Sequence, residues 1–110
     1  MAESELTTIA RPYARAAFAS AREKRSGLQK WSKMLNALGS VVSERVVVEK
    51  LDDPKLTTEE ASVLFEKLLG RELNKEGRNF INVLAEYGRL ELLPIIAYQY
   101  ELLKAEYEKT

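Results

Sequence analysis

Cysteine and histidine are both absent from this 110-residue sequence, and their absence removes several classes of function. Without them the chain has no disulfide, no thiol nucleophile and no Cys/His zinc site. Catalytic triads that need an imidazole are excluded as well. Carboxylates, lysine and tyrosine remain as possible catalytic groups, but no arrangement of them stands out. We therefore expect no catalytic residue, no metal site, no cofactor and no enzymatic activity.

An excess of either charge is also missing, because 17 Lys and Arg balance 17 Asp and Glu. This balance argues against a protein that works by coating nucleic acid or an acidic membrane. The longest apolar run, residues 92–98, contains Pro94 and is far shorter than the ~20 residues that span a bilayer. The N-terminus holds two acids and no apolar run, so we expect no signal peptide.

What is present is a helical pattern along nearly the whole chain. Pro12 fits a helix only in its first turn, so Thr7 and Thr8 are the expected caps of the first helix. The pair Thr57 and Glu60 forms a capping box. Apolar spacing and glycine stops predict helices over residues 9–23, 28–39, 58–69, 78–87 and about 92–107, the last with Pro94 in its first turn.

Residues 40–51 are rich in valine, which favours a strand locally. A lone strand has nothing to pair with, so we expect a short helix or an irregular segment there. The fold class is then all-α, a compact six-helix bundle in one domain over residues 1–110, with one extra short helix as an alternative.

Two charged features have ordinary structural explanations. The paired carboxylates Asp52-Asp53 and Glu59-Glu60 lie at a turn and a helix start, where acids cap and offset the helix dipole. The basic residues between Arg22 and Lys33 are typical of a solvated helix face, with RNA, phospholipid or an acidic partner as alternatives.

The helix over residues 9–23 has more apolar surface than one core contact needs. At about 100° per residue, one arc holds alanines and Phe18, and Arg11, Arg15 and Arg22 hold the charged side. A second arc of uncharged side chains contains Ile9, Tyr13, Ala16 and Ser20. Such a helix either lies deep in the bundle or offers its second arc to a partner.

The helix over residues 78–87 shows the same excess. Phe80, Ile81, Leu84 and Tyr87 make its core arc, and Asn79 and Val83 lie to one side of that arc. If the two helices are neighbours, their spare faces form a groove for an amphipathic helix. The alternative is simple burial of both faces.

Two motifs carry a family resemblance. The stretch TIARPYARAAF at residues 8–18 resembles the opening of the delta subunit of F-type ATP synthase, whose mitochondrial counterpart is the oligomycin-sensitivity-conferring protein. The stretch NFINVLAEYGRL at residues 79–90, followed by Leu93-Pro94, is similar to a second motif of that family. Order and separation also match, and the resemblance covers nearly the whole chain.

The resemblance implies a six-helix N-terminal domain at the top of the catalytic head of the synthase. There, helices one and five would form a groove for the N-terminal helix of an alpha subunit. By position, the contact residues would be Tyr13, Ala16, Ala17 and Val83, with Asn79 as a weaker candidate. Ile9 and Ser20 are added from the helical wheel alone.

The resemblance also implies a non-catalytic stator subunit that holds the head against rotor torque. It would be a peripheral protein on the cytoplasmic face of a bacterial inner membrane, or on the matrix or stromal face in an organelle. Family members continue for about 70 further residues that contact the stalk b subunits, so we expect that part and that contact to be absent here. A stand-alone helical RNA-binding module of the antitermination-factor type is the alternative function.

Overall fold

The computed structural model describes residues 3–109, which form six α-helices and two short 3₁₀ turns. No strand occurs in this described range, so the prediction of an all-α bundle is confirmed. The elements, in chain order, are α1 (Glu3–Arg22), α2 (Gly27–Val41), α3 (Arg45–Leu51), α4 (Thr58–Leu69), η1 (Gly70–Glu72), α5 (Lys75–Glu86), η2 (Leu90–Leu92) and α6 (Leu93–Glu108).

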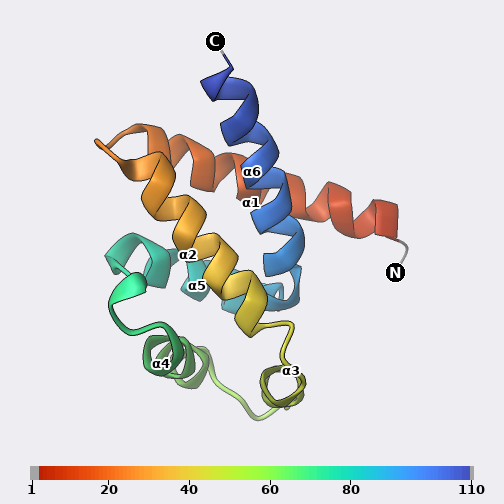
Figure 1. The fold of residues 1–110 in the computed structure, drawn as a ribbon. Coiled ribbons are helices and arrows are strands. Elements are labelled where there is room, and N and C mark those ends of the chain that lie inside the picture. The colour runs from red at the N-terminus through yellow and green to blue at the C-terminus, as the bar shows by residue number, and fades with distance from the viewer. Residues whose placement is uncertain (1–2, 110) are drawn as a thin grey trace.

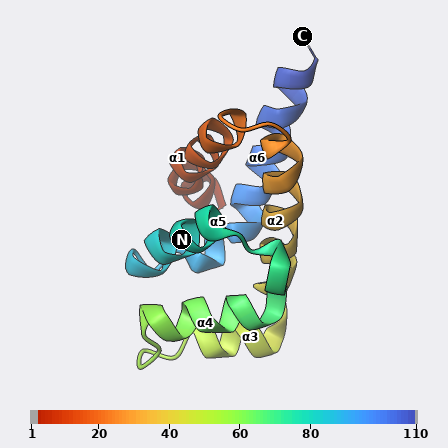
Figure 2. The ribbon, with the colours of Figure 1, turned by 90° about the vertical axis from the view of Figure 1, so that its left-hand side faces the viewer.

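Helices α1, α2 and α6 pack on one another, and α4 packs on α5 beside them (Figure 1). Turned by 90°, α1 and α5 lie on the same side of the molecule, with α3 and α4 at its base (Figure 2). In α1 the core positions are all alanines, namely Ala10, Ala14, Ala17 and Ala21. Because alanine side chains are short, the backbone of α1 can come close to α2 and α6.

The first helix begins earlier than the sequence predicts. Helix α1 starts at Glu3, so Thr7 and Thr8 are not its caps, and Pro12 lies in its interior instead of its first turn. Leu6 and Ile9, which precede the proline, pack against the core, and their burial stabilises the helical turns on the N-terminal side of Pro12. The exposed ring of Pro12 removes one backbone hydrogen bond, which the packing along α1 outweighs.

The other helix boundaries follow local signals in part, because α2 continues past Gly39 to Val41 and α5 begins at Lys75, ahead of the predicted residue 78. The capping box is confirmed, since the backbone N–H of Glu60 donates to Thr57 Oγ1 (3.1 Å) and the N–H of Thr57 donates to Glu60 Oε1 (3.0 Å). Pro94 occupies the first turn of α6, as predicted. The valine-rich segment forms the short helix α3, one of the two structures expected for it.

The largest fully buried side chain is Tyr100 of α6, and its hydroxyl is not left unpaired. It donates a hydrogen bond to the backbone carbonyl of Leu28 (2.7 Å), tying α6 to the start of α2. Burial, followed by the charges of Glu101 and Glu108, raises the pKa of Tyr100. Within residues 3–109, no helix has both the length and the apolar character that crossing a bilayer requires.

Candidate functional site

Helices α1 and α5 run in opposite directions along one side of the molecule, and two side-chain contacts link them through Arg89, which follows α5, and Lys24, which follows α1. Near one end, Arg89 Nη1 donates a hydrogen bond to the hydroxyl of Tyr13. At the other end, Lys24 Nζ lies 3.1 Å from Glu76 Oε1. At a rise of about 1.5 Å per residue, the stretch of α1 from Tyr13 to its last residue, Arg22, is about 14 Å long. We call the surface between the two contacts the α1–α5 groove.

Local structure places Arg89 beside Tyr13, in the middle of α1. Gly88 has a φ of 65°, in the left-handed region that glycine tolerates best. The N–H of Gly88 donates to the carbonyl of Ala85 (3.1 Å) and that of Arg89 to Leu84 (2.8 Å), a Schellman ending of α5. This turn directs the chain back, so that the Arg89 guanidinium lies 5.6 Å from the ring centres of both Tyr13 and Tyr87.

The opposite end of the groove depends on a glycine for a steric reason. A Cβ on Gly27 would collide with the backbone carbonyl of Ala21, so the first residue of α2 can approach the end of α1 only without a side chain. At the start of α5, Asn74 caps the helix, because its Oδ1 accepts from the N–H of Gly77 (2.8 Å). A hollow of about 270 Å³ between these ends is bordered by Ser20, Trp31 and Asn74.

The predicted site residues fall into three groups by exposure. Ala16, Asn79 and Val83 are exposed, and Val83 is 43% exposed despite being apolar. Ile9, Tyr13 and Ser20 are half-buried. Ala17 is only 1% exposed and lies in the core, below the surface that a partner could touch. At one end of the groove, Tyr13 accepts the hydrogen bond from Arg89 and Ile9 borders the hollow that contains Tyr87. At the other end, Ser20 borders the hollow that contains Asn74.

The groove floor is apolar and firmly supported. Phe80 of α5 packs edge-on against Trp31 of α2, with ring centres 5.4 Å apart and planes at 87°. Trp31 is itself buried, so Phe80 cannot move inward without displacing a core side chain. A second hollow of about 510 Å³, bordered by Leu6, Ile9 and Tyr87, extends the groove past Arg89.

The prediction for Tyr87 is wrong, because the structure places this ring outside the core arc. Tyr87 is 65% exposed and follows the last residue of α5, where the helix turns at Gly88. Sequence reasoning also missed Arg89, which contacts both tyrosines. Gly88 was the sequence signal that could have identified Arg89. A glycine in the left-handed conformation after a helix turns the chain, so the next residue points back toward the body of the protein.

The arrangement suits the binding of an apolar helix face. Among residues 3–109, no three acidic side chains converge to hold a metal ion. Two hollows join α1, at Ser20 and at Ile9, to the two ends of α5, and Val83 is an exposed apolar side chain on α5. These are the surfaces on which the apolar face of an amphipathic helix packs.

Comparison with known proteins is consistent with this description. The sequence model of the ATP synthase delta (OSCP) subunit family matches residues 9–110. The ATP synthase subunit delta of Aliivibrio fischeri (strain ATCC 700601 / ES114) is 44% identical over 106 residues, covering 96% of this chain and 59% of that protein. The subunit delta of Bordetella avium (strain 197N) is 40% identical over 107 residues, covering 97% and 60%. This chain thus spans about three fifths of the length of these relatives.

Proposed function

The chain belongs to the ATP synthase delta (OSCP) subunit family, and on that premise we propose that its α1–α5 groove binds the N-terminal helix of an alpha subunit. In this proposal the chain is a non-catalytic component of the stator, associated with the membrane-bound synthase through other subunits. The observation that carries it is the pair of hollows that α1 shares with the two ends of α5, bordered by Ser20 and by Ile9, together with the exposed Val83 on α5.

The task of such a subunit is mechanical. Rotation of the central shaft applies torque to the catalytic head, and the head must stay still for the torque to change its conformation. A groove that is fixed at both ends resists sliding of a bound helix, because the Tyr13–Arg89 and Lys24–Glu76 contacts set the distance between its walls. Contacts to the peripheral stalk would be made by parts of the family's longer proteins that match no residue here.

Helix burial in the groove can supply tight binding. Each large apolar side chain that a partner buries contributes about 1.5–3 kcal/mol. Association itself costs about 4–15 kcal/mol, and nanomolar affinity needs a net of about 12 kcal/mol. Several buried side chains are therefore required, which a groove of about 14 Å, or roughly two and a half helical turns, can accommodate.

The test is calorimetric titration with a synthetic peptide of about 20 residues from the N-terminus of the cognate alpha subunit. We expect saturable one-to-one binding. Val83→Ala should weaken it about fivefold, because the lost contact area corresponds to roughly 1 kcal/mol. The control is Val46→Ala on α3, which truncates a valine that is more exposed than Val83 (65% against 43%) and lies far from the groove, and it should leave affinity unchanged.

A charge placed in the groove gives a stronger test. Ala16→Asp should weaken the peptide at least tenfold, because a bound apolar face would desolvate an unpaired carboxylate. Ala19→Asp, on an exposed position of α1 outside the groove, is the control. Absence of peptide binding to a folded chain, or equal affinities for the Ala16 and Ala19 variants, would contradict the proposal.

A further inference from the structure

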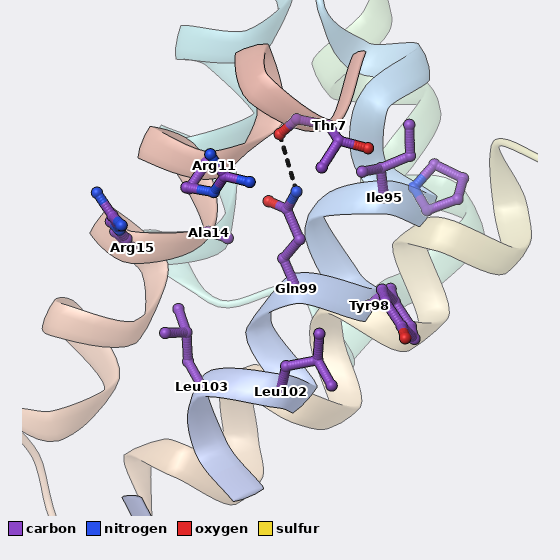
Figure 3. Close-up of a pocket in the computed structure, with 10 residues that line it drawn as sticks. Thr7, Arg11, Ala14, Arg15, Ile95, Tyr98, Gln99, Leu102 and Leu103 are labelled. Carbon is purple, nitrogen blue, oxygen red and sulfur yellow. Dashed lines mark hydrogen bonds between the residues drawn. The ribbon is translucent and has the colours of Figure 1, made fainter. Parts of the chain in front are cut away.

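A further hollow, separate from the two beside α5, lies on the opposite side of α1, between α1 and α6 (Figure 3). Its volume is about 570 Å³, larger than either hollow of the α1–α5 groove. We call it the α1–α6 hollow. Its walls are formed by Arg11, Ala14 and Arg15 of α1 and by Tyr98, Gln99 and Leu102 of α6, with Leu103 below.

Helix α6 is apolar on the side that faces this hollow as well as on its core side. Ile96 and Tyr100 are buried in the core, whereas Tyr98 is 66% exposed and Leu102 is 54% exposed. Ile95, Tyr98 and Leu102 are spaced three and four residues apart, so they form one stripe along the helix. Within this stripe Ile95 is half-buried against the core, whereas residues 5–109 leave Tyr98 and Leu102 largely exposed.

Two arginines form the α1 rim of the hollow. Arg11 and Arg15 are exposed and one helical turn apart, and within residues 5–109 neither makes an ion pair or a hydrogen bond. Arg89 and Arg22, by contrast, lie over aromatic rings. The rim therefore offers two cations with no counter-charge in the described part of the chain.

A hydrogen-bond acceptor inside the hollow is unused. Gln99 Nε2 donates to the backbone carbonyl of Thr7 (2.9 Å), which fixes the amide between α6 and α1 (Figure 3). The other amide atom, Gln99 Oε1, is shielded from solvent and has no partner in the described residues. A buried acceptor without a donor is unfavourable, so an N–H group from a ligand would be stabilised there.

We propose that the α1–α6 hollow binds the acidic N-terminal part of an amphipathic helix from a protein partner. Its apolar side chains would cover the stripe of Ile95, Tyr98 and Leu102. Two carboxylates one turn apart would match the spacing of Arg11 and Arg15. The first turn of a helix has free N–H groups and favours acidic residues, so it can supply the donor that Gln99 lacks.

Other occupants satisfy fewer of these features. A basic helix would be repelled by the two arginines, and a fatty acid would bring no N–H to Gln99 Oε1. The proposal does not depend on what binds in the α1–α5 groove, because the two surfaces share α1 but none of the residues named for them.

The test is selection from a displayed library of helical peptides against the 110-residue chain. The library keeps leucines at one apolar face and varies two flanking positions, one turn apart, among Glu, Gln and Lys. We expect enrichment of Glu at both positions and submicromolar-to-micromolar binding that weakens with salt, since exposed charge pairs are screened. No binder, or binders without Glu enrichment, would overturn the proposal.

Variants assign the binders to the hollow. Arg11→Glu with Arg15→Glu should weaken a selected Glu peptide at least tenfold and, in a repeated selection, should enrich Lys. Lys67→Glu with Arg71→Glu changes the net charge equally at exposed positions on the far side and should leave the affinity within about twofold. Leu102→Asp should abolish binding, whereas loss with Val83→Asp alone would place the peptide in the other groove and overturn the proposal.

Discussion

The α1–α5 groove and the α1–α6 hollow share helix α1 but are built differently. The α1–α5 groove is closed at both ends by contacts between side chains, and uncharged small residues line its α1 wall. In the α1–α6 hollow, a hydrogen bond from Gln99 Nε2 to the backbone carbonyl of Thr7 joins the two helices, and Arg11 and Arg15 at its rim are unpaired among residues 5–109. The two surfaces therefore differ in charge: the α1 wall of the groove is uncharged, whereas the α1 rim of the hollow carries two cations.

This difference follows from how α1 enters the core. Its buried positions are alanines, so α6 and α2 approach its backbone closely and leave the longer side chains on its two flanks. Tyr13 goes to one flank and the arginines to the other. A single helix can thus serve two surfaces with separate chemistry, provided that its core contact uses short side chains.

Replacing Ala17 should have the largest effect on stability, because Ala17 is buried in the core beneath α1, the helix that both surfaces share. Ala17→Asp buries a carboxylate without a partner in the core, which we expect to cost several kcal/mol and to unfold the chain or abolish both surfaces together. Ala16→Asp, one position earlier and exposed, should change the unfolding free energy by less than about 1 kcal/mol. Circular dichroism during urea unfolding gives both values, and similar losses would refute the placement of Ala17.

Replacing Gly27 should cause the second-largest loss of stability, and the change in structure should be confined to one end of the α1–α5 groove. In Gly27→Ala the new methyl group meets the carbonyl of Ala21, so the backbone must shift, at a cost of about 1–3 kcal/mol. Gly88→Ala meets no atom within 4 Å and should cost only about 1 kcal/mol, from its positive φ. If both variants lost equal stability, the steric argument for Gly27 would fail.

Much of the fold could be predicted from sequence, because most helix boundaries depend on local chemistry. Thr57 with Glu60, Pro94 and Gly88 mark a start or an end that the structure confirms. The start of α1 could not be predicted in this way. Its proline pointed to a first turn, but burial of Leu6 and Ile9 against residues far along the chain decides where the helix begins.

The candidate site was predictable only in part. Helical wheels identify the spare faces that contain Tyr13 and Val83, because exposure follows from spacing on a single helix. They could not identify Arg89, whose position depends on the turn at Gly88, and they misplaced Tyr87 at the end of α5. Contacts between distant segments need the tertiary arrangement.

Tyr13→Phe should loosen one end of the α1–α5 groove without touching the other surface. The variant keeps the ring under the Arg89 guanidinium but removes the hydroxyl that accepts its hydrogen bond. We expect a loss of about 0.5–1.5 kcal/mol in unfolding free energy. Tyr98→Phe in the α1–α6 hollow removes an exposed hydroxyl and should stay within about 0.5 kcal/mol. Equal losses would mean that the Tyr13 hydroxyl contact adds nothing.

The smallest effect should be a pH dependence located at the far end of the α1–α5 groove. Glu91 borders the hollow that contains Ile9 and Tyr87, and it lies beside Asp52. A hydrogen bond with Asp52, then burial, then the Asp52 charge raise the pKa of Glu91 above its ordinary 4.5. The folded state therefore favours protonated Glu91, and the stability this gives is present below pH 4.5 and lost as the pH rises through the folded-state pKa.

Glu91→Gln imitates the protonated side chain, so the variant should gain stability relative to the parent as the pH rises from about 4 to about 7. Denaturant unfolding at the two pH values measures this difference. The same substitution in an Asp52→Asn background should show a smaller change, because the group that shares the hydrogen bond is gone. A difference that is constant with pH, or one that favours the parent at about pH 7, would show that the two carboxyl groups do not interact in the folded chain.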